Sequence, residues 1–215
     1  MSKSTRTTQQ ILDDVQRTMD IAEQGYMDFV KDPKKRLAGL MNLTIWGVSV
    51  TSVLQTLRHI EPDFDQWYKK YSAEMLSDPL MRYFWILRSE ILKEGKLNVS
   101  TFIHIKHLTS LDFDRIPKPP SNVKVKEFFM GDNLGGSGYV IQQPDGSDEK
   151  YYVEIPSDIM TVSLHFPDPP EMHLEKKLLE HSVESLSRLY LDYLQRMVKD
   201  AKARFEQKTN SEVTK

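Results

Sequence analysis

Arg88 is the residue whose placement most suggests chemistry. It lies in the segment Tyr83–Gly95 (YFWILRSEILKEG), whose pattern predicts an apolar helix that ends at a glycine. A guanidinium keeps its charge near neutral pH and has five N–H donors to satisfy. Arg88, with Ser89 beside it, therefore either faces water or a partner as an ion-pairing residue, or binds an anionic group such as phosphate.

A second candidate is the glycine-rich segment Met130–Tyr139 (MGDNLGGSGY), which lies between two predicted strands. Its four glycines within eight residues could present backbone amides to a phosphate. However, no Lys-Ser or Lys-Thr pair follows, and the next predicted element is a strand, so a P-loop is excluded. The alternative is a hairpin loop in which the glycines supply positive φ angles. The candidate ligand contacts are Asp132, Asn133, Gly135 and Gly136.

Histidines are the other side chains able to move protons or bind metals. His104 and His107 would share a face of a helix but would point to opposite sides of an extended segment, and their β-branched neighbours favour the extended form. His165, His173 and His181 are spaced eight residues apart, yet proline-rich sequence separates the first from the other two. Since neither HExxH nor a pair of ExxH segments occurs, we predict no metal site and no cofactor.

Composition excludes several classes of protein. The 215 residues contain no cysteine, which rules out thiol catalysis and thiolate zinc sites and fits a reducing cytoplasm. A net charge of −2 argues against a surface that grips nucleic acid over its whole extent. Residues 37–57 carry no charge, but a third of them are polar, so we expect a buried central helix rather than a membrane span. We predict a cytoplasmic protein without membrane contact.

The elements that position these residues are mostly helical. Hydrophobic periodicity predicts four main helices, at about 8–30, 34–60, 79–93 and 172–208, and a shorter one at 64–75. Ser77-Asp78-Pro79 is a helix-start signal, with Asp78 as the N-cap candidate, and Gly95 stands where a left-handed C-terminal cap is expected.

Three stripes on these helices predict packing. Small polar side chains on the second helix would let another helix approach, in the bundle or across a dimer; they are Asn42, Ser49, Ser52 and Thr56. A seven-residue repeat predicts the buried face of the last helix; it comprises Leu179, Val183, Leu186, Tyr190, Tyr193 and Met197. Aromatic residues at helical spacing favour core packing over base stacking; they are Phe64, Trp67, Tyr68, Tyr71, Tyr83, Phe84 and Trp85.

Residues 96–170 have a different texture, rich in proline and glycine. Alternating patterns predict strands at about 123–129, 139–143, 150–155 and 160–166, with a turn at Pro144–Ser147. The expected fold is therefore mainly α: an up-and-down bundle of four main helices with a small antiparallel β insertion, at about 121–166, before the last helix. We predict a single domain over 1–215, with 8–95 and 172–208 forming the bundle.

The segment Tyr83–Gly95 and the order of helices around it resemble the HEPN superfamily of prokaryotic defence and toxin–antitoxin proteins. The resemblance covers the helical parts, about two-thirds of the chain, although its motif is only a few residues long. In active HEPN ribonucleases an arginine is followed, after four to six residues, by a histidine, and two subunits pair to build the site. Arg88 and Ser89 match the first part, while the histidine positions hold Lys93, Glu94 and Gly95.

This departure decides what the resemblance implies. In the family's chemistry the arginine holds the scissile phosphate and the histidine moves protons during attack by the 2′-hydroxyl. Lys93 could add charge but is a poor proton shuttle near pH 7. The remaining catalytic candidates are then Arg88 and Lys93 with His104 or His107 as substitutes.

Two functions are consistent with the sequence. One is a HEPN-like, non-catalytic or weakly catalytic component of a defence or toxin–antitoxin system that binds RNA, a nucleotide or a partner protein. The other is a structural module that only mediates association. In both we expect a homodimer, built through the small-polar stripe of the second helix or the repeat of the last one.

Overall fold

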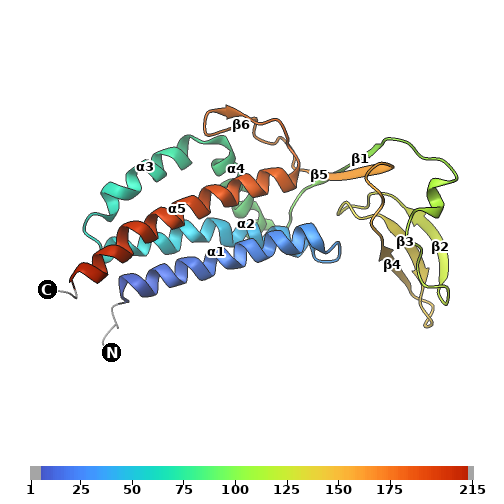
Figure 1. Cartoon of the computed structure of the whole chain (residues 1–215), viewed down its shortest axis with the longest axis horizontal. Coiled ribbons are helices and arrows are strands. Elements are labelled where there is room, and N and C mark those ends of the chain that lie inside the picture. The colour runs from blue at the N-terminus through green and yellow to red at the C-terminus, as the bar shows by residue number, and fades with distance from the viewer. Residues whose placement is uncertain (1–5, 213–215) are drawn as a thin grey trace. The chain divides into compact units, whose positions relative to one another are not determined.

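The computed structural model describes residues 6–212, and the side chains of residues 6–206. The chain divides into two compact units, which we call the helical unit (residues 1–97, 169–181 and 185–215) and the β unit (98–168 and 182–184). These boundaries lie close to those predicted for an insertion at 96–170. The predicted class, mainly α with a small antiparallel β insertion, is confirmed (Figure 1).

The helical unit contains five α-helices in the described part of the chain: α1 (Thr8–Lys31), α2 (Arg36–Leu54), α3 (Phe64–Ser77), α4 (Pro79–Glu94) and α5 (Val183–Glu212). A short 3-10 helix, η1 (Gln55–His59), extends α2. The breaks follow the predicted signals: α1 ends before Asp32-Pro33, and α4 begins at the proline after its Asp78 cap. α1, α2 and α5 run alongside one another (Figure 1).

A close helix contact is made by two glycines, Gly25 of α1 and Gly39 of α2. A β-carbon on Gly39 would lie 2.6 Å from both the carbonyl oxygen of Gly25 and the backbone nitrogen of Phe29. Of the predicted small-polar stripe, Ser52 is exposed, whereas Asn42 borders this contact: its β-carbon would lie 3.1 Å from a β-carbon added to Gly25. Glycine permits the approach because it has no side chain to separate the two backbones. Even the short side chain of a serine or asparagine would keep them apart.

An aromatic cluster fastens α3 to α5. The Phe64 ring stacks on Tyr68 at 5.2 Å, and Trp67 meets Phe205 edge-on at 5.3 Å between ring centroids. Asp200 of α5 accepts hydrogen bonds from the Trp67 indole (3.0 Å) and the Tyr71 hydroxyl (2.6 Å). The predicted core packing is confirmed for Phe64, Tyr68, Tyr71 and Phe84, whereas Trp67 and Tyr83 are half-buried and Trp85 is 61% exposed.

The last helix begins later than predicted. Residues from Met172 onward first form a hairpin of two short strands, β6 (Met172–His173) and β7 (Lys176–Lys177), and α5 starts only at Val183. Leu174 and Glu175 have positive φ angles, which a helix does not accommodate. Leu179, expected on the buried face, is 93% exposed, whereas the rest of the predicted repeat is buried.

The β unit contains two antiparallel sheets. Strands β1 (Ser100–Ile105) and β5 (Met160–His165) form a two-stranded ribbon, and β2 (Lys124–Phe129), β3 (Gly138–Gln142) and β4 (Asp148–Tyr152) form a three-stranded sheet. A single 3-10 turn, η2 (Asp112–Asp114), lies between β1 and β2. The insertion's strands therefore begin at residue 100, earlier than the predicted 121, because β1 finds its partner about sixty residues further along the chain.

One helical stretch in the described chain, Arg36–His59, has the length and composition of a membrane span, with mean hydropathy 1.5 over its most apolar window. Inside the protein 39% of that window is buried. Leu40, Leu43, Val50 and Leu54 belong to the core of the helical unit. A buried core helix satisfies the same criteria of length and composition as a span.

Candidate functional site

The sequence around Arg88 folds as predicted. The Asp78 side chain accepts a hydrogen bond from the Met81 backbone nitrogen (2.9 Å) and caps α4, and Gly95 closes the helix with a left-handed φ of 65°. Arg88 is half-buried, and its Nε is shielded from solvent without a hydrogen-bond partner in the described residues. A shielded donor without a partner is unusual, because it forfeits its hydrogen bond to water.

Arg88 gains no catalytic partner from its own helix. Lys93 is exposed, and five residues place it roughly 140° around the helix from Arg88. The Ser89 hydroxyl donates to the Trp85 carbonyl oxygen at 3.1 Å, so it is engaged within the helix. Arg88 and Lys93 thus do not converge on one point.

The candidate histidines are divided between the two units: His104, His107 and His165 belong to the β unit, and His173 and His181 to the helical unit, where His173 Nδ1 lies 3.0 Å from Asp78. His104 is on β1, where the extended form is confirmed, and its side chain is exposed. His107 follows the strand and places Nδ1 3.1 Å from Oδ2 of the buried Asp112. Of the remaining candidates, His165 approaches the Ser163 hydroxyl at 3.0 Å. No group of three or more potential metal ligands occurs among the described residues.

The glycine-rich loop folds around its own carboxylate. Oδ1 of Asp132 accepts from the backbone nitrogens of Leu134 (3.0 Å) and Gly136 (2.9 Å), and Oδ2 accepts from Lys150 Nζ (2.7 Å) and the Tyr152 hydroxyl (2.8 Å). The Gly135 nitrogen donates to the Asp132 carbonyl oxygen at 2.9 Å. Burial alone would raise the pKa of Asp132, but these bonds outweigh it and hold that pKa below its usual value.

This geometry favours the structural interpretation of the loop. The amides that the sequence offered to a phosphate are occupied by an internal anion. Asn133 is exposed and lies outside this network. Ligand contacts at Asp132, Asn133, Gly135 and Gly136 stay a prediction without support from the geometry.

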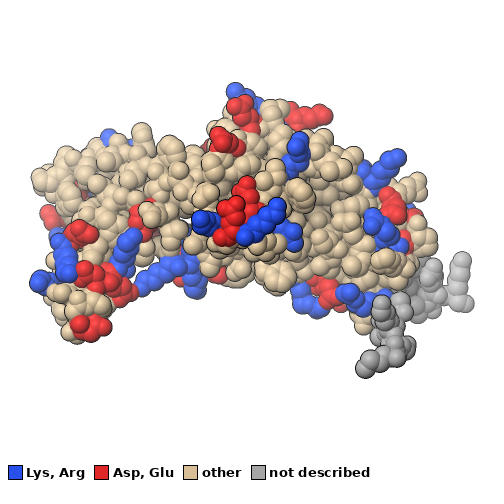
Figure 2. Space-filling view, turned by 180° about the vertical axis from the view of Figure 1, so that it is seen from behind, with Lys and Arg blue, Asp and Glu red and all other residues tan. Residues whose placement is uncertain are grey.

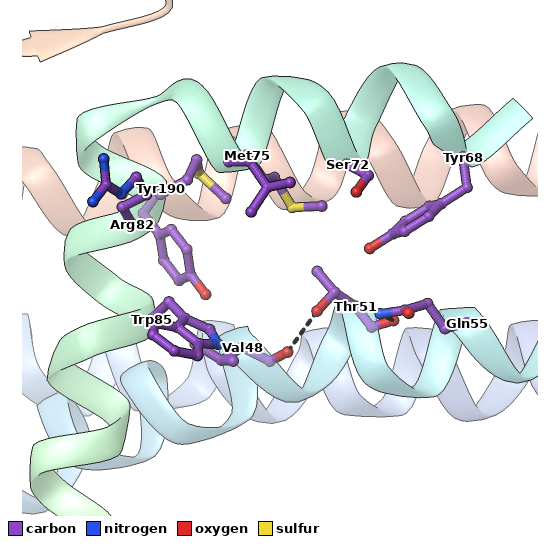
Figure 3. A pocket seen from close by; sticks show the side chains of 11 residues that line it. Val48, Thr51, Gln55, Tyr68, Ser72, Met75, Arg82, Trp85 and Tyr190 are labelled. Carbon is purple, nitrogen blue, oxygen red and sulfur yellow. Dashed lines mark hydrogen bonds between the residues drawn. The ribbon is translucent and has the colours of Figure 1, made fainter. Parts of the chain in front are cut away.

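The site that the sequence did not predict is a cavity within the helical unit. It has a volume of about 350 Å³ and lies between α2, η1, α3, α4 and α5 (Figure 3). Its walls are mostly apolar, and Arg82 is the one charged residue among those that line it, which are Val48, Thr51, Gln55, Tyr68, Ser72, Met75, Leu76, Met81, Arg82, Trp85 and Tyr190.

Two lining residues mark where the cavity opens. Leu76 is 72% and Trp85 is 61% exposed, although both contribute to its wall. Leu76 lies in the last turn of α3, and Trp85 lies in the second turn of α4. Cavities of this size with apolar walls are typical of sites for small molecules.

Surface charge favours no particular partner. On the face shown in Figure 2, basic and acidic side chains are interspersed between wide uncharged areas. The β unit holds six lysine and arginine residues against eleven aspartate and glutamate residues. Phosphate-rich partners are attracted by an excess of basic residues, whereas the β unit has an excess of acidic ones.

A protein-family model described as Bacteriophage lambda protein ea47 matches residues 4–202, which is most of the chain. The chain belongs to this family. No curated protein and no solved structure matches it. The ea47 family description names no activity, ligand or partner, so function has to be inferred from the geometry. Every residue that lines the cavity lies within the segment that the ea47 family model matches.

Sequence patterns in this ea47 family member contain a weak signal for the cavity. Tyr68, Ser72 and Met75 follow helical spacing, as do Val48, Thr51 and Gln55. Each trio mixes apolar and small polar side chains, as a ligand-lining face does, but so does the edge of an ordinary helix interface. Only the packing of four helices and η1 shows that these faces surround a common space.

Proposed function

We propose that this ea47 family member is a non-catalytic binding component, and that its helical unit holds an apolar ligand in the cavity between α2, η1, α3, α4 and α5. The observation that carries the proposal is the combination of a 350 Å³ apolar cavity with an opening flanked by exposed Leu76 and Trp85. Large exposed apolar side chains beside a cavity are typical of binding sites.

The arrangement of the polar residues supports binding over RNA cleavage. General acid–base catalysis needs a proton-transferring group within hydrogen-bond reach of the reacting atoms. On α4, Arg88 has no such group beside it, and Lys93 faces another direction. The resemblance to HEPN proteins, a role in defence or toxin–antitoxin biology, and a cytoplasmic location stay parts of the hypothesis. In the same hypothesis α1, α2, α4 and α5 are the main helices of an up-and-down bundle, and α3 completes the cavity wall.

Filling the cavity tests the proposal. Ser72 lines the cavity and Ala73, its neighbour on α3, is exposed and does not. We expect Ser72→Phe to weaken binding of a neutral apolar fluorescent probe such as N-phenyl-1-naphthylamine at least tenfold, because the added ring occupies the ligand's space. Ala73→Phe adds the same ring outside the cavity and should bind within about twofold of the wild type. Circular dichroism would establish that both variants are folded. Equal probe binding by all three proteins contradicts the proposal.

A second candidate function is anion binding at Arg88, favoured by its shielded Nε without a partner in the described residues. RNA is the anion to test, in keeping with the HEPN resemblance. If Arg88 contacts phosphate, Arg88→Ala should lower RNA affinity about tenfold, whereas exposed Lys93→Ala should change it by less than threefold, as measured by fluorescence anisotropy. Light scattering on the same samples tests the expected homodimer. Wild-type protein that neither binds nor cleaves RNA excludes this function.

A further inference from the structure

Tyr190 contributes the most deeply buried polar group of the cavity. Its side chain is 2% exposed, yet its hydroxyl points into the cavity, toward Trp85 and Val48 (Figure 3). No hydrogen bond to this hydroxyl occurs among the described residues. Burial raises the pKa of Tyr190, so the hydroxyl stays protonated and is available as a donor.

Two contacts fix the direction of this hydroxyl. The Tyr190 ring stacks on Phe84 with 4.1 Å between centroids and 8° between planes. On the α2 side the ring lies over Gly47, where a β-carbon would come within 2.6 Å of Cε1 and 3.1 Å of the hydroxyl oxygen. A ring held this way cannot turn to another partner without losing its packing, so the donor is preorganised.

The other phenol of the cavity belongs to Tyr68, which lies at the opposite end in Figure 3. Its ring stacks on Phe64 with 5.2 Å between centroids. Beside it, the Thr51 hydroxyl donates to the Val48 carbonyl oxygen at 2.9 Å. The two phenols therefore mark opposite ends of the cavity, and Tyr190, at 2% against 7% exposed, is the more deeply buried of them.

We infer that the cavity binds a neutral, mostly apolar small molecule that presents a hydrogen-bond acceptor, such as a ketone or ester carbonyl, to the Tyr190 hydroxyl. This rests on the proposed function and specifies its ligand. The acceptor binds a donor that faces the cavity and pairs with no described residue, while the body of the ligand contacts Met75, Met81 and Val48. A charged group is disfavoured inside, because the cavity's one charged residue, Arg82, directs its guanidinium away from it (Figure 3).

Three probes of nearly equal shape test the inference by NMR titration: ethylbenzene, acetophenone and benzoate. Tyr190→Phe removes only the hydroxyl, so we expect it to weaken acetophenone binding about three- to tenfold and to leave ethylbenzene binding within about twofold. Benzoate should bind more weakly than acetophenone. Tyr68→Phe serves as the control, since Tyr68 lies at the opposite end of the cavity from Tyr190 (Figure 3), and should leave the preference of the protein for acetophenone intact.

The outcomes separate the two proposals. If Tyr190→Phe changes acetophenone and ethylbenzene binding by the same factor, or if benzoate binds most tightly, the ligand class is wrong while the cavity still binds apolar molecules. If no probe binds the wild type, and Ser72→Phe likewise leaves the fluorescent probe unaffected, the proposed function itself fails.

Discussion

Replacing Asp78 by alanine is expected to lower the free energy of unfolding of the helical unit by about 3–5 kcal/mol, because each buried donor left without its partner costs about 1–3 kcal/mol. Asp78 is 5% exposed and joins two segments distant in sequence. It caps α4 through the Met81 nitrogen, and its carboxylate also lies 3.0 Å from His173 Nδ1 and accepts from the Leu174 nitrogen at 2.6 Å. Alanine would leave all three groups unsatisfied. Urea unfolding followed by circular dichroism measures the loss.

The same carboxylate makes stability depend on pH. Burial by itself raises the pKa of Asp78, but hydrogen bonds from His173, Leu174 and Met81 outweigh it and lower that pKa below its usual value. A carboxyl whose pKa is lower in the folded state stabilises the protein above its unfolded pKa of about 3.9, and this contribution is lost as pH falls through the folded value.

Asp78→Asn should therefore be less stable than the wild type at pH 7, and the gap should narrow between about pH 5 and pH 2. Asparagine can still cap the helix, so the loss at pH 7 should be smaller than for alanine. Asp13, exposed on α1, provides the control: Asp13→Asn should keep the wild-type pH dependence. A constant gap between Asp78→Asn and wild type across this range would show that the charge of Asp78 does not contribute.

Gly39→Ala is expected to destabilise the helical unit by about 2 kcal/mol, which reverses the ordinary sign of this change. In an open helix, alanine in place of glycine stabilises by about 1 kcal/mol, because glycine loses more backbone entropy on folding. Here the added methyl meets the backbone of α1, where both the Gly25 carbonyl oxygen and the Phe29 nitrogen would be 2.6 Å away. Since neither atom can rotate aside, the two helices must move apart.

Thermal unfolding checks this sign, with a fall of roughly 4–8 °C expected for a protein of this size. Gly25→Ala should have a similar effect, because its β-carbon would lie 2.6 Å from the Leu43 nitrogen and 2.7 Å from the Gly39 carbonyl oxygen. Ala38→Ser changes the exposed neighbour of Gly39 and should shift the midpoint by less than 2 °C. An unchanged or raised midpoint in Gly39→Ala would mean that the α1–α2 contact is looser than described.

Local rules located most helix boundaries in this chain. Asp78-Pro79 and Gly95 bound α4 because a carboxylate cap, a fixed φ and a left-handed glycine each act within a few residues. The same reasoning failed at the start of α5. The apolar repeat continues backward through Leu179, but the turn at Leu174 and Glu175 belongs to a hairpin that Asp78, almost a hundred residues away, holds through His173 and Leu174.

The chemistry of the candidate residues depended on the fold in a similar way. The sequence identified Asp132 and the glycines around it as a potential anion site. It could not show that the Asp132 carboxylate itself accepts the hydrogen bonds of the loop amides. It identified Arg88 as an arginine without a histidine at the motif spacing. It could not show that the Arg88 Nε is shielded from solvent and has no partner among the described residues. Hydrogen-bond satisfaction is a property of three-dimensional packing, and residue types reveal only which groups need partners.

The sequence by itself determined the mainly helical class, the β insertion, the missing motif histidine and the caps of α4, because periodicity, composition and capping are local properties. Tertiary structure alone decided the glycine contact between α1 and α2, the pairing of β1 with β5 and the cavity around Tyr190. Each of these brings together residues distant along the chain. The Tyr190 hydroxyl shows the difference most clearly: spacing placed Tyr190 on a buried face, but only the packing of α2 and α4 against it left its hydroxyl facing a cavity.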